Sequence, residues 1–114
     1  MLPSLKFEGT ARVINKGVDV TLLTDEKGSG DAFWVSRYLV VKGISAAVLS
    51  VTQLDPVDMR TIRYYEETTG VLIFLKKDVY DAVRTQLLKK TRAVLLEEEQ
   101  SDRLPGEIAR IAGR

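Results

Sequence analysis

The chain contains neither cysteine nor histidine in its 114 residues, and these two absences exclude several kinds of chemistry. Without cysteine there is no disulfide, no thiolate zinc site and no cysteine nucleophile. Without histidine the commonest general base and transition-metal ligand are missing, so a Ser-His-Asp triad cannot form within the chain. Any catalysis would have to use carboxylates, lysine, tyrosine or a magnesium ion held by oxygen ligands.

An excess of charge of one sign is also absent, because 17 Lys and Arg residues balance 16 Asp and Glu residues. A net charge of +1 creates no overall field for nucleic acid or membrane, so either role needs a local patch. No apolar run approaches the length of a membrane span, and the first residues lack the apolar core of a signal peptide. We expect a soluble, cytoplasmic protein with no membrane partner. The lack of cysteine and the many Arg, Val, Leu and Glu residues also favour a thermostable protein.

The length is typical of one domain. We expect a single α/β domain over residues 1–100 and a C-terminal tail over 101–114. The tail is predicted to form a short helix after Pro105, with Ile108 and Ile111 on one side. That apolar pair predicts docking on the body of the domain or on a partner.

Alternating residues over 5–13 predict a strand with one solvent-facing side, followed by a turn and a second strand over 18–23. These two strands are expected to form a hairpin. The stretch DAFWVSRYLVVKG contains β-branched and aromatic residues, which favour a strand over residues 31–42. A helix capped by Asp31 and ended by Gly43 is the alternative.

The second half of the chain predicts two further strands and two helices. Apolar runs at 44–51 and 71–75 are expected to be strands, the latter central and covered on both faces. A helix is predicted to start near Asp55, which can cap it, and to stop at Gly70. A long amphipathic helix is predicted over residues 79–99.

These elements predict an α/β (α+β) fold in the order ββββαβα. Its sheet would be mostly antiparallel or mixed, with about five strands, and helices would cover one face. If residues 31–42 were helical, three consecutive βα units with a parallel sheet would follow instead. The spacing of Gly17, Gly43 and Gly70 supports that alternative.

Three segments between residues 16 and 90, KGVDVTLL, WVSRY and YYEETTGVLIFLKKDVYDAVRTQLLKK, carry a resemblance to a known family. Together they resemble the restriction-endonuclease-like superfamily, especially its Mrr-like branch, whose catalytic signature is PD-(D/E)XK. The resemblance implies a magnesium-dependent nuclease fold with Asp19 in the metal-binding place. Trp34 and Ser36 stand where the second acidic or amide ligand and the lysine belong, so the resemblance implies a degenerate catalytic motif.

A strand over 31–42 would place Trp34 and Tyr38 on one face, near Lys6 and Arg12 of the first strand. Aromatic rings flanked by cations bind single strands by stacking on bases and pairing with phosphates. We therefore expect a non-catalytic protein that binds single-stranded or structured DNA or RNA through an aromatic and basic sheet face. Lys42, Arg60 and Arg63 would extend the basic rim of this face. Arg37 would lie among the apolar residues of the strand, where it either pairs with a helix acid such as Glu66 or Glu67 or contacts a phosphate. The alternative is that both rings pack beneath the C-terminal helices.

Two other functions stay open at this point. A magnesium-dependent nuclease would use Asp19 with acids from a neighbouring loop, namely Asp25, Glu26 or Asp31. A purely protein-binding subunit would form a homo-oligomer, such as a homodimer, through the 79–99 helix. We favour a protein that is not an enzyme and that uses no cofactor, with magnesium needed only by the nuclease.

Overall fold

The computed structural model describes residues 11–97 and 103–113. Within these ranges the chain forms five strands, four α-helices and one 3-10 helix: β1 (Ala11–Asn15), β2 (Val20–Thr24), α1 (Ser29–Val41), β3 (Ala46–Val51), α2 (Met59–Thr69), β4 (Val71–Phe74), α3 (Lys77–Val83), η2 (Arg84–Gln86), β5 (Arg92–Leu95) and α4 (Leu104–Ile111). The predicted α/β class with a mixed sheet of five strands is confirmed. No helix in the described ranges is long and apolar enough to cross a membrane.

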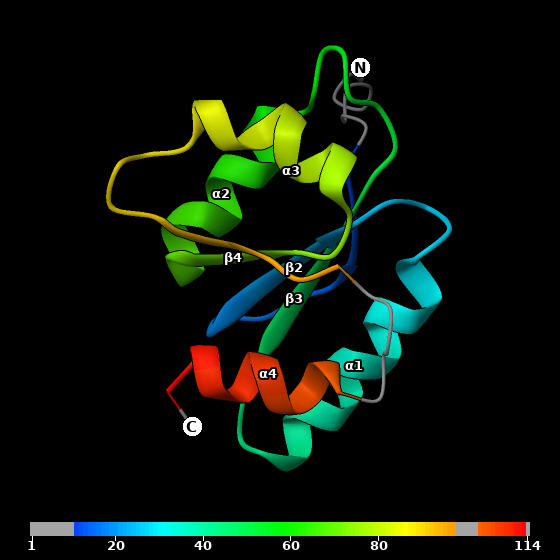
Figure 1. Ribbon diagram of the computed structural model, residues 1–114, viewed down its shortest axis with the longest axis vertical. Helices are drawn as coiled ribbons and strands as arrows, with labels where there is room; N and C mark the ends of the chain where they lie inside the picture. Colours follow the sequence, from blue (N-terminus) through cyan, green and yellow to red (C-terminus); the bar gives the residue numbers. More distant parts are fainter. Residues whose placement is uncertain (1–10, 98–102, 114) are drawn as a thin grey trace, which may run out of the picture.

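The sheet has the strand order β1-β3-β2-β4-β5 (Figure 1). Its four strands β3, β2, β4 and β5 are mutually parallel, and β1 is antiparallel at the edge beside β3. Every residue of β2 and β3 is buried. Strands that are apolar on both faces belong in the middle of a parallel sheet. The prediction of strands at 44–51 and 71–75, the latter covered on both faces, agrees with this arrangement.

Helices cover both faces of the sheet, so the expectation of a single covered face is wrong. Parallel crossovers are right-handed, and β3 lies on the opposite side of β2 from β4. The crossover through α1 therefore lies on one face and those through α2 and α3 lie on the other (Figure 1). Strand residues alternate accordingly: Leu22 belongs to the core beneath α1 and α4, and Leu23 to the core beneath α2 and α3.

Residues 31–42 form most of helix α1, which corrects the prediction of a strand. The helical alternative, and with it the succession of βα units, fits the structure better. The buried residues Ala32, Val35, Ser36 and Leu39 recur at helical spacing. Parallel β2 and β3 also need a crossover between them, which a hairpin turn cannot supply. The β-branched and aromatic residues that favoured a strand lie mainly on the outer side of the helix.

Strand β1 pairs with β3 and not with β2, so the predicted hairpin is absent. The connection from β1 to β2 has to pass the start of β3, which separates them. Gly17 makes this passage possible, because a Cβ atom there would lie 2.3 Å from the Ala46 carbonyl carbon and 2.4 Å from the Ala47 nitrogen. The part of the first predicted strand before residue 11 lies outside the described residues.

The predicted helix over 79–99 is wrong from residue 87 to residue 97, and residues 98 and 99 lie outside the described residues. Strand β4 needs a hydrogen-bonding partner on its outer edge, and β5 supplies it. The buried carboxylate of Glu66 fixes the turn before β5: it accepts hydrogen bonds from the Leu88 backbone at 2.7 Å and from the Thr91 hydroxyl, and it pairs with Arg63. Pairing across the sheet thus outweighs the local helical pattern.

Helix α2 begins later than predicted, because Asp58 and not Asp55 caps it. The Asp58 carboxylate accepts hydrogen bonds from the Thr61 backbone at 3.3 Å, the Thr61 hydroxyl at 3.0 Å and the Ala11 backbone at 3.2 Å. Burial raises the pKa of Asp58, but these hydrogen bonds outweigh it and bring the pKa below its usual 3.8. The helix ends as predicted at Gly70, whose φ of 71° suits glycine.

We predict that Gly17→Ala lowers the free energy of unfolding by about 1–3 kcal/mol, because the added methyl group meets backbone atoms that cannot rotate away. Gly30→Ala is the matched control, since a Cβ atom at Gly30 meets nothing within 4 Å. The control should leave stability unchanged or raise it by up to about 1 kcal/mol. Urea denaturation followed by circular dichroism measures both, and equal effects would contradict the steric argument.

We predict that Asp58→Ala lowers the free energy of unfolding by about 1–2 kcal/mol at pH 7, because an N-cap and a tie to β1 are lost. A carboxyl with a lowered pKa stabilises the folded state above its unfolded pKa. The difference between wild type and variant should therefore shrink as the pH falls below 3.8 and through the lower folded pKa. A difference that stays constant from pH 7 to pH 2 would show that ionisation of Asp58 plays no part.

Candidate functional site

The outer side of α1 is a solvent-exposed aromatic surface. Trp34, Tyr38 and Val41 are spaced four and three residues apart, and their exposed fractions are 65%, 61% and 86%. This spacing places them on one side of the helix, opposite the buried residues that face the sheet. We call Trp34, Tyr38 and Val41 the α1 surface. Contiguous exposed apolar groups of this size are typical of surfaces that bind another molecule.

Two of the predicted cations lie close to the α1 surface. Arg37 is exposed on the same helix, and Lys42 is exposed directly after its end. Within the described residues, Arg37 forms no hydrogen bond or ion pair through its side chain. Lys6 lies outside the described residues.

The other predicted cations belong elsewhere, so the expected aromatic and basic sheet face does not form. Arg12 on β1 lies 3.8 Å from Glu26, at the edge of the sheet. Arg60 and Arg63 belong to α2, on the opposite face from α1, and Arg63 pairs with Glu66. The sheet faces are themselves covered by helices, which leaves no room for bases to stack on them.

Asp19 does not gather the other acids around a magnesium ion. It precedes β2 and accepts a hydrogen bond from the Ser45 backbone at 2.8 Å, whereas Asp25, Glu26 and Asp31 follow β2 at its other end. In the part of the chain that the structure describes, no three acidic side chains come close enough to hold a metal ion.

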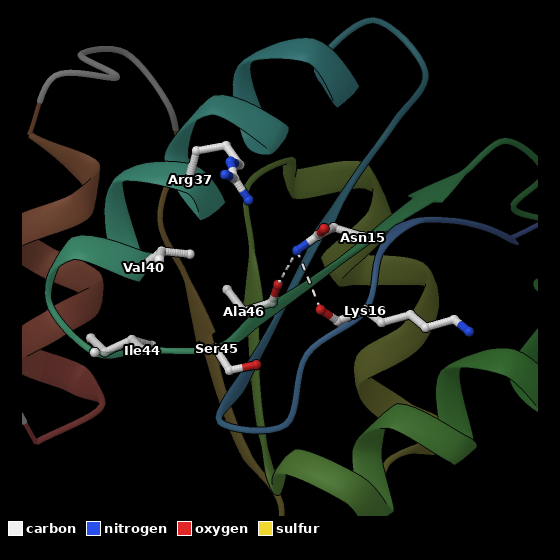
Figure 2. Close-up of a pocket in the computed structure, with 8 residues that line it drawn as sticks. Asn15, Lys16, Arg37, Val40, Ile44, Ser45 and Ala46 are labelled. Atoms are coloured by element: carbon white, nitrogen blue, oxygen red, sulfur yellow. Dashed lines mark hydrogen bonds between the residues drawn. The ribbon is translucent and has the colours of Figure 1, made fainter.

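A cavity of about 400 Å³ lies beside α1, at the edge of the sheet where β2 and β3 begin (Figure 2). The β1–β2 connection, the second half of α1 and the start of β3 surround it, through Asn15, Lys16, Arg37, Val40, Gly43, Ile44, Ser45 and Ala46. Arg37 points into the space between α1 and Asn15 (Figure 2). The Asn15 amide nitrogen donates to the Ala46 carbonyl at 2.9 Å and to the Lys16 carbonyl at 3.3 Å.

Sequence reasoning singled out Arg37 but missed Asn15 and Ser45. In the sequence Asn15 looks like an ordinary turn residue. Ser45 is a short polar residue before an apolar strand, which is too common a pattern to indicate a site. Their proximity depends on the order of the strands, because β1 and β2 lie on either side of β3. That order is a property of the whole fold.

A second, smaller cavity of about 330 Å³ lies at the carboxyl ends of β2 and β3, a common ligand position in parallel sheets. Its lining mixes acids and bases: Asp25, Glu26, Lys27 and Asp78. Nearby, the Thr24 hydroxyl is buried without a hydrogen-bond partner, but Gly28 packs directly on it. This end of the sheet therefore has an excess of carboxylates over cations in its lining and offers no open, unsatisfied donor.

Comparison with known proteins places this fold within larger enzymes. No family model matches the chain. Part of it is 32% identical over 71 residues to 1-deoxy-D-xylulose-5-phosphate synthase of Desulforudis audaxviator (strain MP104C). That match covers 62% of this chain and only 11% of the synthase.

Two solved structures share the fold over almost the whole chain. A split gene transketolase, described as an inactive β4 tetramer, matches 99% of this chain with a TM-score of 0.68 at 19% identity. A 2-oxoglutarate:ferredoxin oxidoreductase from Magnetococcus marinus matches 95% with a TM-score of 0.72 at 13% identity. The chain spans 40% of the first protein and 20% of the second.

These matches overturn several expectations. The fold is shared with parts of a transketolase and of a 2-oxoglutarate:ferredoxin oxidoreductase, so the resemblance to the restriction-endonuclease-like superfamily is wrong. Nucleic-acid binding and nuclease activity lose their support with it. The expectation of no cofactor is also contradicted, because the related families work with thiamine diphosphate and a metal. The described residues do not fit such a metal site, since they assemble no group of three ligands.

The α1 surface should contribute little to the stability of the isolated chain. We predict that Trp34→Ala/Tyr38→Ala changes the free energy of unfolding by less than about 1 kcal/mol, because both side chains are mostly exposed. Leu39→Ala, on the buried side of the same helix, should cost about 2–5 kcal/mol. Urea denaturation followed by circular dichroism compares them. Similar losses would mean that the two rings are part of the core.

Proposed function

We propose that this chain is a domain or subunit of a transketolase-like enzyme that holds the assembly together and does not itself carry the catalytic centre. The observation that supports this most is the disparity in coverage. The fold accounts for 99% and 95% of this chain but for only 40% and 20% of the two enzymes that share it. Most of each of these enzymes has no counterpart in this chain, and the catalytic residues can lie in those other regions.

The composition of the chain supports the same role. It has no histidine and no cysteine, and its described carboxylates cap helices, join ion pairs or lie apart on the surface. In this proposal the part of the enzyme that binds thiamine diphosphate and its metal lies outside the described residues. The chain contributes rigidity and a contact surface.

The α1 surface is where we place the contact with the rest of the enzyme. Trp34 and Tyr38 are large, rigid and exposed, and such residues supply much of the binding energy at protein interfaces. The exposed positions of α1 also contain few charges, as expected for the centre of an interface. We keep a homo-oligomer within this proposal, because the split gene transketolase is described as a tetramer.

A cytoplasmic location belongs to the same proposal. The chain contains no cysteine, so nothing in it would draw on an oxidising compartment for folding.

The test is to purify the tagged full chain from its native cells and to identify stably bound proteins by mass spectrometry. We expect a transketolase-like protein in a fixed ratio to the chain. Trp34→Ala/Tyr38→Ala should lower its recovery at least about tenfold, since interface aromatic residues commonly contribute 1–2 kcal/mol or more each. Tyr64→Ala is the matched control, because Tyr64 is 63% exposed on α2, at the opposite face. A chain that purifies without any transketolase-like protein would refute the proposal.

A further inference from the structure

The geometry points to a second binding site in this chain: the cavity lined by Arg37 takes an oxyanion, a carboxylate or phosphate group of a small molecule. We call this cavity, beside the second half of α1, the Arg37 cavity. The inference does not depend on the proposed role in an enzyme assembly, because it concerns a cavity built within one chain.

The charges around the Arg37 cavity are of one sign. Among the residues that the structure describes, Arg37 and Lys16 are the only ionised ones in its lining, and no carboxylate of the described ranges lines it. The nearby acid, Asp19, accepts a hydrogen bond from the Ser45 backbone at 2.8 Å and is not part of the lining. In a chain whose total charge is +1, this is a local concentration of positive charge. A concave surface of one sign raises the local concentration of the opposite ion.

The guanidinium of Arg37 is available for a ligand. No hydrogen bond or ion pair joins its side chain to the described residues, although arginine has five N–H donors arranged in a plane. The group points into the cavity, toward Asn15 (Figure 2). A planar pair of donors matches the two oxygens of a carboxylate or phosphate. The Lys16 ammonium points away from the guanidinium, so direct binding would fall to Arg37 (Figure 2).

Ser45 and Asn15 shape the wall of the cavity. The Ser45 hydroxyl oxygen accepts a hydrogen bond from the Val18 backbone at 3.1 Å, which leaves its hydrogen free to donate. The Asn15 amide donates to the Ala46 and Lys16 carbonyls and is thereby fixed in place. The donor Arg37 thus comes from a helix, and the facing wall comes from the residues at the start of a strand. Both are rigid supports for a site.

The size and remaining walls of the Arg37 cavity limit the ligand. Its volume of about 400 Å³ lies at the low end of small-molecule sites. Val40 and Ile44 give it an apolar wall, which suits a short carbon chain attached to the anionic group. A small organic acid and a phosphate ester share this chemistry, and they differ in the geometry and charge of the oxyanion.

The experiment titrates the ¹⁵N-labelled full chain with inorganic phosphate in one arm and succinate in the other, at constant ionic strength kept with sodium chloride. Signals of the Arg37 Nε–H group and the Ser45 backbone amide report binding at the cavity. We expect saturable shifts with at least one anion, and the tighter arm identifies the phosphate or the carboxylate as the natural group. Arg37→Gln should weaken binding about tenfold or more, because a charge-assisted pair of hydrogen bonds is lost.

Arg84→Gln is the matched control, because it removes the same charge from η2 on the opposite face of the sheet. It should change the affinity by less than about twofold if long-range charge is a small term. Arg37→Lys, which keeps the charge and loses the planar pair of donors, should bind more weakly than the wild type. The inference is overturned if neither anion gives saturable shifts, or if Arg37→Gln binds as tightly as the wild type. Neither result bears on the α1 surface, because no partner protein is present.

Discussion

The burial of β2, β3 and β4 on both sides is the constraint from which the rest of this structure follows. Strands without a polar face cannot lie against water, so each side of the sheet needs a layer of helix. The order β3-β2-β4 then divides the crossovers between the two sides. Helix α1 covers one side. Its inner residues pack on the sheet, and its outer residues are exposed and can contact other molecules. The candidate contact surface is thus a by-product of covering the sheet.

Much of the interior could be read from local sequence, because a buried parallel strand has a signature of its own. The run at 71–75 is apolar without interruption, and β4 lies there. The predictions for residues 31–42 and 79–99 were wrong because the conformation favoured by each local sequence differs from the one that the sheet requires. The first had β-branched residues but had to bridge parallel strands as α1; the second had a helical stripe but had to complete the edge of β4 as β5.

The sequence singled out some residues of the candidate sites but missed Asn15 and Ser45, and it did not predict which residues lie together. Aromatic rings and a cation inside an apolar run are unusual, and this pattern singled out Trp34, Arg37 and Tyr38. All three are exposed in the structure. The predicted site grouped these residues with Arg60 and Arg63 on one face of the sheet. In the structure α1 and α2 lie on opposite faces, so the two groups are apart. Composition says which chemistry is possible within a chain. The side of the sheet on which a residue appears depends on the handedness of crossovers, which no local window contains.

The pairing of β1 has a consequence for how the chain is made. Ala11 pairs with Val51, the last residue of β3, so β1 finds its neighbour only after β2, α1 and β3 have been synthesised. Strand β2 also finds its neighbour in β3, so the antiparallel edge and the first parallel pair both depend on the same strand. Strands β4 and β5 come later in the chain and extend the sheet on the other side of β2.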